Sequence, residues 1–294
     1  MYVVVELALV LVLLGYFTLL ERKTLGYGQV RKGPNKGVLM GLVQPLLDGF
    51  KLFMKGFKGV NKGSMMVFFG TPGLGLWGVL VMWWVVMELL GVWGEGLSLL
   101  LIILIGAGIS LLFFLSGYLS GCGYSELGSM RALAQALTYE GVLVFSVLMV
   151  MMMGYSSKFM LGGFTVGFKL MLLSLIIVSV VMESSRTPTD FVEGESELVS
   201  GLASEAGGLS FTALFLIEYG LMGFYACFVV VLMSGFVVGT MCMVVMPLAI
   251  MVILNWLRLS LPRSRYDLVM EWGWKVMLAA VFYLMVIVFS LVLA

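Results

Sequence analysis

Acidic side chains are the groups in this sequence that are best suited to chemistry. The segment from 183 to 208 reads ESSRTPTDFVEGESELVSGLASEAGG and sets six acids against the single base Arg186. The acids are Glu183, Asp190, Glu193, Glu195, Glu197 and Glu205. Burial and mutual repulsion both raise the pKa of a carboxylate, so such a cluster can hold protons near neutral pH. For the segment taken alone, a solvated acidic loop is an equally good interpretation.

Three further acids, Glu88, Glu140 and Glu218, lie in or beside long apolar stretches. An ionisable group near the centre of a bilayer costs at least about 2.5–3.5 kcal/mol, so by default it indicates function. Glu218 has apolar residues on both sides and is the strongest single candidate. A structural ion pair with Lys169 or Arg131 is the alternative role for Glu218.

Several kinds of redox and hydrolytic site are excluded by residue types that are missing or isolated. The chain has no histidine, and its three cysteines, Cys122, Cys227 and Cys242, are far apart. This chain by itself therefore cannot provide a histidine haem ligand, a histidine proton relay, a Ser–His–Asp triad or a CxxC metal site. We expect it to bind no cofactor or metal, with any redox centre lying elsewhere.

The elements that position the acids must be membrane helices. Apolar residues make up 62% of the 294 residues and charged residues 11%, and the mean hydropathy is +1.12. A soluble domain carries roughly 25% charged residues. The chain is therefore predicted to be an all-α polytopic membrane protein with a single membrane domain over 1–294. Its net charge of +1 gives no indication of nucleic-acid binding.

Eight segments are apolar over about the 20 residues that a helix needs to cross a bilayer. They are 2–20, 67–90, 97–119, 139–154, 164–182, 211–234, 236–257 and 274–294. The first is interpreted as a retained helix because it lacks a basic start and a cleavage site. The short fourth segment and the weak break at 234–235 leave seven or nine spans as alternatives. No internal repeat is present, which disfavours transporter folds built from duplicated halves.

The positive charges agree with eight spans. Fourteen of the 17 lysines and arginines follow odd-numbered spans, and nine of these lie between Arg22 and Lys62. The positive-inside rule then places both termini on the negative side. In the first loop, apolar residues recur at helical spacing between Leu39 and Phe53, which predicts an amphipathic surface helix. Its Asp48 is either part of an anchoring surface or a group at a polar cavity mouth.

Six motifs in chain order resemble one family, subunit 1 of NADH:ubiquinone oxidoreductase (respiratory complex I). They are LLERKTLGYGQVRKGPNKG at 19–37, QPLLDGFKLFMK at 44–55, TYEG at 138–141, ESSRTPTDFVEGESELVSG at 183–201, IEYG at 217–220 and PRSRYD at 262–267. Composition and buried acids also fit an independent proton- or cation-coupled transporter, which is the preferred interpretation before these motifs are weighed. A subunit docking onto a membrane-bound hydrogenase is a more distant alternative. The motifs favour complex I.

The resemblance implies a subunit that walls the ubiquinone tunnel and passes protons through buried acids. By motif, the tunnel region would include Arg22, Arg31 and Asp48. The acidic path would include Glu140, Glu183, Asp190, Glu193, Glu195, Glu197 and Glu218, with Arg131, Arg186, Tyr219 and Arg265 as polar partners. Ubiquinone would be the substrate of the complex, with FMN and iron–sulfur clusters in partner subunits.

The expected partners are the quinone-site and iron–sulfur subunits of the peripheral arm, small membrane subunits and lipid. The chain departs from the family pattern at Gly56, where the family usually has Glu, and at 200–206, where SGLASEA replaces SGFNVEY. Abundant Met, Val, Gly and Phe beside few Pro and no His indicate a strand-biased mitochondrial genome. We therefore expect the mitochondrial inner membrane, with a bacterial plasma membrane as the alternative.

Overall fold

Apolar stretches of this length form helices because a helix pairs every main-chain N–H and C=O internally, as lipid requires. The computed structural model describes residues 2–35, 41–56, 65–90, 95–155, 164–184, 186–190, 206–234 and 240–293, and within these ranges the regular elements are all helices. They are α1 (Tyr2–Gly28), α2 (Gln44–Met54), α3 (Met65–Leu90), α4 (Glu95–Leu119), α5 (Gly123–Tyr155), α6 (Phe164–Glu183), α8 (Leu209–Ser234), α9 (Thr240–Ser260), α10 (Tyr266–Trp272) and α11 (Leu278–Leu293).

Six of the described helical segments are long and apolar enough to cross a membrane, and α6 and α9 contain two shorter apolar ones. Each of the eight predicted spans falls on one of these helices, counting α10 and α11 as one helix joined by the π-helical turn Gly273–Met277. The prediction of an all-α polytopic membrane protein is confirmed.

Three predicted spans are parts of longer helices, in each case because polar residues continue the helix. The fourth span was placed at 139–154, yet α5 begins at Gly123 and its polar Ser125, Ser129 and Gln135 are buried inside the protein. The first span was ended at 20, whereas α1 continues through the charged ERK residues to Gly28. The last was begun at 274, whereas the helix starts at Tyr266.

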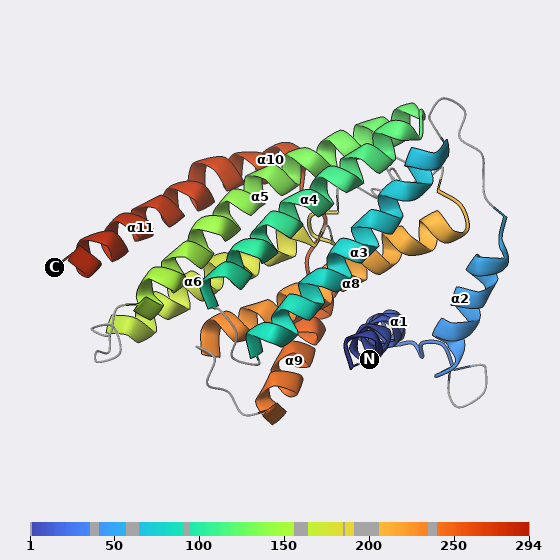
Figure 1. Ribbon diagram of the computed structural model, residues 1–294, viewed down its shortest axis with the longest axis horizontal. Helices are drawn as coiled ribbons and strands as arrows, with labels where there is room; N and C mark the ends of the chain where they lie inside the picture. Colours follow the sequence, from blue (N-terminus) through green and yellow to red (C-terminus); the bar gives the residue numbers. More distant parts are fainter. Residues whose placement is uncertain are drawn as a thin grey trace.

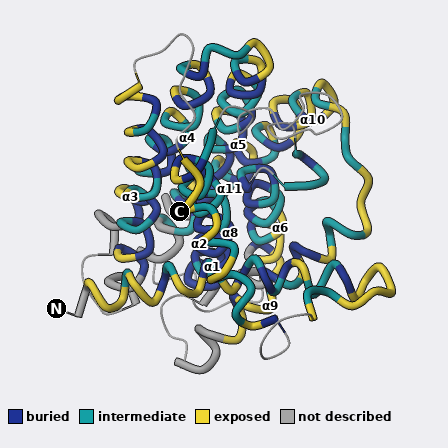
Figure 2. Tube along the Cα trace, turned by 90° about the vertical axis from the view of Figure 1, so that its right-hand side faces the viewer, coloured by how far each residue is buried: buried dark blue, intermediate teal, exposed yellow. Residues whose placement is uncertain are grey.

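Helix α8 lies at the centre of the bundle. In one 18-residue apolar stretch of α8, 72% of the residues are buried, against 22–44% in the corresponding stretches of the other five long spans. Figure 2 shows the buried residues gathered along the inner faces. Gly220 lets α3 approach closely, because a Cβ there would lie 2.5 Å from the Val79 side chain. The Trp83 indole also donates a 3.1 Å hydrogen bond to the Gly220 carbonyl.

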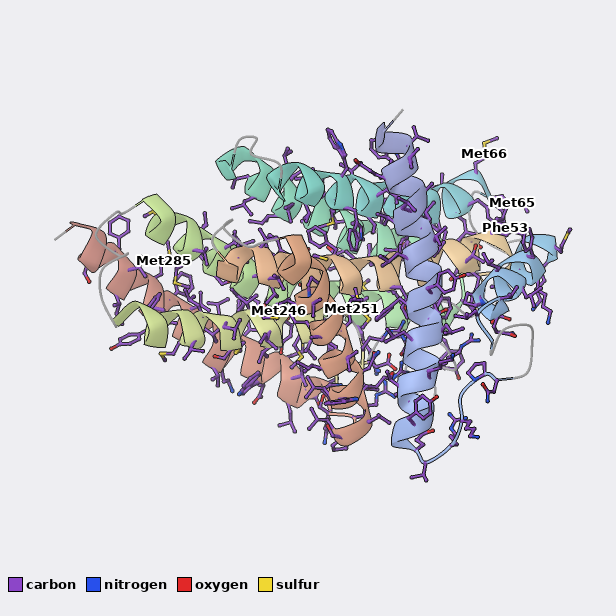
Figure 3. The ribbon with its side chains drawn as sticks, turned by 90° about the horizontal axis from the view of Figure 1, so that it is seen from below. Phe53, Met65, Met66, Met246, Met251 and Met285 are labelled. Carbon is purple, nitrogen blue, oxygen red and sulfur yellow. The ribbon has the colours of Figure 1, made fainter. Side chains whose placement is uncertain are left out.

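Helices α1 and α2 are arranged differently from the bundle. Helix α1 is seen nearly end-on in Figure 1 and along its length in Figure 3, so it crosses the long helices α3, α4 and α5 at a large angle. It packs against α8, α9 and α3. Helix α2 lies at the edge of the molecule and has no buried residue. Its apolar Leu47, Phe50 and Phe53 are exposed, as expected for the predicted amphipathic surface helix.

Candidate functional site

A cluster of four charged groups, of which Glu21 is buried and the other three are partly buried, joins three helices and the segment after α6. Glu21 of α1 is 4% exposed, and it pairs with Arg258 of α9 and, at 3.8 Å, with Arg186. Arg186 also lies 3.5 Å from Glu218 of α8. Two positive and two negative groups therefore balance in the interior. Buried ions persist only when they are paired in this way.

Tyr219 completes the charge cluster. Its ring lies under the guanidinium of Arg186, with 4.5 Å between the guanidinium carbon and the ring centroid, and its hydroxyl hydrogen-bonds Glu21. A cation over an aromatic face gains about 0.5–2 kcal/mol, the higher value when water is excluded. Phe17 of α1 packs edge-on against the same ring at 5.5 Å. These contacts leave the guanidinium little freedom to turn.

The segment that carries the arginine is held by hydrogen bonds from distant parts of the chain. Gln135 of α5 donates to the carbonyls of Met182 at 2.6 Å and Thr189 at 3.2 Å. The main-chain N–H and the hydroxyl of Ser264 both donate to the Pro188 carbonyl, at 2.9 and 2.8 Å. An irregular segment can be buried only when its main-chain groups find such partners. The polar residues of α5 thereby fix the end of α6.

A second polar group lies deeper, between α4, α5, α6 and α8. The Tyr225 hydroxyl of α8 hydrogen-bonds Glu183 at the end of α6, and the Ser110 hydroxyl of α4 hydrogen-bonds Glu140 of α5. One oxygen of each of these two carboxyl groups has no hydrogen-bond partner among the described residues. No described lysine or arginine forms an ion pair with either of them. Both carboxyl groups therefore keep the capacity to bind a proton or a water.

Two internal cavities connect the charge cluster to these deeper acids. The larger, of about 40 Å³, is lined by Gly106, Ile109, Ser110, Phe113, Ala132, Ala136, Glu183, Ser184, Glu218, Leu221 and Tyr225. The smaller, of about 10 Å³, is lined by Met82, Ile102, Ile103, Gly106, Glu140, Leu143, Val144, Glu183 and Tyr225. A cavity holds a water once it offers about 10–15 Å³ and polar partners. The larger cavity can hold a short chain of waters and the smaller about one.

A separate polar groove opens at the surface between the end of α1 and the start of α2. It measures about 490 Å³ and is lined by Arg22, Lys32, Gly33, Pro34, Asn35 and Gln44. Asp48 of α2 accepts bonds at 2.9 Å from both Arg22 and Gln44, which fixes the rim of the groove. Small-molecule sites have volumes of about 300–1,000 Å³. Four of the six lining residues carry charged or amide side chains, so the groove offers hydrogen bonds to a ligand with oxygen atoms.

The structure brings together only part of the predicted site. Glu183, Glu140 and Glu218 line the two cavities, and Arg186 and Tyr219 join Glu218 in the charge cluster. The ion pair described for Glu218 is with Arg186, whereas the sequence alternative named Lys169 or Arg131. Glu193, Glu195, Glu197 and Glu205 lie outside the described residues, as do the side chains of Glu88 and Lys169.

The remaining predicted residues lie away from the cavities. The main-chain carbonyl of Asp190 accepts a bond from Arg263, and Arg131 lies over the Tyr266 ring at 5.7 Å. Arg265 pairs with Asp267 at the surface at 3.0 Å. Arg31 is exposed beyond the end of α1, where it bonds Gln29 at 2.8 Å. At Gly56 an added Cβ would meet no atom within 4 Å.

Four functional candidates were missed from the sequence. Glu21 directly follows the predicted span 2–20 and Arg258 the predicted span 236–257, and both lie near basic residues, where a further charge gives no indication of burial. Tyr225 and Ser110 lie in apolar helices where a hydroxyl carries no strong signal. A stricter count of polar groups within the predicted spans would have drawn attention to Tyr225, but its partner Glu183 depends on the packing of α6 against α8.

Comparisons with known proteins identify the family of this chain. The family model described as NADH dehydrogenase matches residues 1–289. NADH-ubiquinone oxidoreductase chain 1 of Heterololigo bleekeri is 39% identical over 95% of this chain and 92% of its own length. Chain 1 of Apis mellifera ligustica is 35% identical over 96% of this chain and 94% of its own length. Chain 1 of Artemia franciscana is 35% identical over 94% of this chain and 93% of its own length. The chain therefore belongs to the NADH dehydrogenase family, in which these relatives are chain 1 of NADH-ubiquinone oxidoreductase.

Proposed function

We propose that this chain is a core membrane subunit of NADH:ubiquinone oxidoreductase that walls the access path of ubiquinone and links its reduction to proton movement. The likeness to chain 1 over nearly the full length of the relatives supports membership of that complex. Its place is the mitochondrial inner membrane, beside the quinone-site and iron–sulfur subunits and the small membrane subunits. FMN and the clusters belong to those partners, and this chain supplies no redox group.

The observation that carries the proton-coupling role is the sequence of buried acids from the charge cluster to α5. Glu218 lies at the charge cluster and at the larger cavity, Glu183 lies between the two cavities, and Glu140 lies at the far end of the smaller one. Waters in these cavities would place the three carboxyl groups within proton-transfer range of one another. A change of charge near Arg186 acts on Glu218 directly, because little water screens a buried pair.

Reduction of the quinone supplies such a change of charge. One end of the charge cluster is Glu21, which directly precedes the groove residue Arg22 in α1. A negative or protonated quinone headgroup near Arg22 would shift the balance between Glu21, Arg186 and Glu218. A shift equivalent to one pKa unit is about 1.4 kcal/mol, so a small rearrangement is sufficient to load or release a proton.

Infrared difference spectroscopy tests whether a buried carboxyl group follows quinone reduction. We expect the difference spectrum between the oxidised and the quinone-reduced complex to contain a carbonyl band of a protonated carboxyl group. In Glu140→Gln that band is expected to be lost or reduced, because the amide cannot titrate. Glu271→Gln, which removes an exposed carboxylate paired with Lys275 at 3.4 Å, should leave it intact. An unchanged spectrum in Glu140→Gln would take that residue out of the path.

Asp48→Asn tests the quinone role of the polar groove. The Arg22–Asp48 pair is partly exposed, at 55% and 31%, so its loss should alter stability by less than about 1 kcal/mol. The KM for ubiquinone is expected to rise by up to about fivefold, because an exposed charge pair that orients the rim is worth up to about 1 kcal/mol and about 1.4 kcal/mol corresponds to a tenfold change. NADH oxidation with a hydrophilic artificial acceptor should stay normal.

Asp267→Asn is the matched control, since it breaks the exposed Arg265–Asp267 pair, which lies away from the groove. Its KM for ubiquinone is expected to equal that of the native complex. Equal KM values in both variants would remove the groove from the quinone path and leave the Arg22–Asp48 pair as a surface contact.

A further inference from the structure

The two internal cavities meet at three residues, Gly106 of α4, Glu183 of α6 and Tyr225 of α8. These are the lining residues that both cavities share. Tyr225 is 3% exposed, and its hydroxyl hydrogen-bonds Glu183. The second oxygen of Glu183 has no hydrogen-bond partner among the described residues. The junction therefore presents one hydroxyl and one carboxyl oxygen with unused hydrogen-bonding capacity.

Gly106 keeps the space in front of the Tyr225 hydroxyl open. A Cβ built on Gly106 would lie 3.8 Å from the Tyr225 oxygen and 3.8 Å from the Met82 methyl group, and within 4 Å of no other atom outside its own stretch of helix. A methyl group therefore fits there in ordinary van der Waals contact. It would, however, occupy part of the volume that a water needs to reach the hydroxyl, in cavities of only about 40 and 10 Å³.

A structural role alone accounts less well for the Tyr225 hydroxyl. A buried tyrosine needs one partner for its hydroxyl, and a main-chain carbonyl is sufficient. Tyr139, which is fully buried, has such a partner and donates to the Val269 carbonyl at 2.8 Å. The hydroxyl of Tyr225 bonds an acid between two cavities instead. A hydroxyl both donates and accepts, so it can take up one proton while it releases another.

We infer that Tyr225 is a proton-relay residue between the two cavities and that the missing side chain at Gly106 keeps this relay accessible to water. Protonated Glu218 gives its proton to a water in the larger cavity as that water gives one of its own protons to the Tyr225 oxygen and the tyrosine O–H proton passes to the Glu183 carboxylate. One O–H bond forms and one breaks at the same oxygen, so the phenol is unchanged. Glu183 then passes a proton through the smaller cavity to Glu140. Tyr225 has this role only if the buried carboxyl groups carry protons as proposed for them.

The test uses the assembled complex reconstituted in vesicles, with proton pumping and quinone reduction measured together. Tyr225→Phe keeps the ring and removes the relaying oxygen, so pumping is expected to fall at least about tenfold. Solvent deuterium should slow quinone reduction more in this variant than in the native complex, because proton transfer becomes limiting. Tyr139→Phe also removes a buried hydroxyl. It should reduce thermal stability while leaving pumping per NADH and the isotope effect unchanged.

Gly106→Ala tests the same junction without altering the tyrosine. Alanine favours a helix over glycine, so the variant should assemble, and pumping is expected to fall as in Tyr225→Phe. Gly108→Ala is the matched control, since it makes the same change two residues along α4 where an added Cβ meets nothing within 4 Å. If Tyr225→Phe does not assemble, Gly106→Ala decides alone. Normal pumping in Gly106→Ala would overturn the relay. Reduced pumping in Gly106→Ala beside normal pumping in Gly108→Ala would support it.

The outcome also separates this relay from the wider coupling role. If Glu140→Gln and Glu218→Gln stop pumping while Tyr225→Phe and Gly106→Ala pump normally, the acids carry protons by another route and the relay is wrong. If all four variants pump normally, both the relay and the coupling role fail.

Discussion

Replacing Glu140 or Glu218 with glutamine is expected to abolish proton pumping and quinone reduction together. Glutamine keeps the shape of the side chain and removes the group that titrates. Proton transfer by a positioned side chain contributes about 10²–10⁴-fold in rate, so pumping should fall by about a hundredfold or more. The complex should still oxidise NADH with a hydrophilic artificial acceptor, because the proposed function assigns the redox centres to other subunits.

Assembly of these variants is expected from the way the charges are paired. In Glu218→Gln, Arg186 keeps its second carboxylate, Glu21, at 3.8 Å. Glu140 forms no ion pair with a described base, so its exchange leaves no described charge without a partner. Glu271→Gln on the exposed face of α10 is the control and should pump normally. Normal pumping and quinone turnover in both buried variants would rule out a coupling role for them, and loss of assembly would assign them a structural one.

Replacing Arg186 with methionine is expected to prevent stable assembly of the subunit. The change leaves Glu218 buried beside the Tyr219 ring without the ion pair that the structure describes for it. Removing one partner of a buried ion pair costs about 3–5 kcal/mol. That is a large share of the roughly 5–15 kcal/mol by which proteins are stable. The amount of complex on a native gel and its thermal inactivation temperature are the measurements.

Two further variants show whether charge or packing is responsible. Arg186→Met combined with Glu218→Gln should recover much of the lost assembly, because the double variant no longer buries the Glu218 charge without its partner. The stability effects of substitutions at contacting residues are not additive. Arg265→Met breaks a pair that is 78% and 66% exposed and should lower stability by less than about 1 kcal/mol. An inactivation temperature for Arg186→Met equal to that of Arg265→Met would show that the buried cluster does not stabilise the protein.

The sequence by itself determined the class of protein and the position of most helices. Hydropathy reports the free energy of moving a segment from water into lipid, which is nearly additive along the chain and needs no knowledge of neighbours. The same reasoning marked Glu218, because an acid within an apolar segment is costly wherever the helix lies. The spacing of Leu47, Phe50 and Phe53 indicated the surface helix α2 in the same way.

Hydropathy failed where polar residues face protein instead of lipid. Ser125, Ser129 and Gln135 made the start of α5 resemble a loop, yet all three are buried between helices and the Gln135 amide holds the end of α6. Only tertiary contacts reveal that these groups have partners. A count of polar residues along one segment cannot distinguish a satisfied interior group from an exposed one.

The pairing within the site was decided by the tertiary structure alone. Glu21 and Arg258 are 237 residues apart, and they meet because α1 crosses the bundle and packs along α9. Tyr225 meets Glu183 because α8 is central and turns that face toward the end of α6. Charges and hydroxyl groups act over a few ångströms, so their partners depend on the tilt and rotation of whole helices. Those angles result from the sum of all packing contacts, so no single sequence motif predicts them.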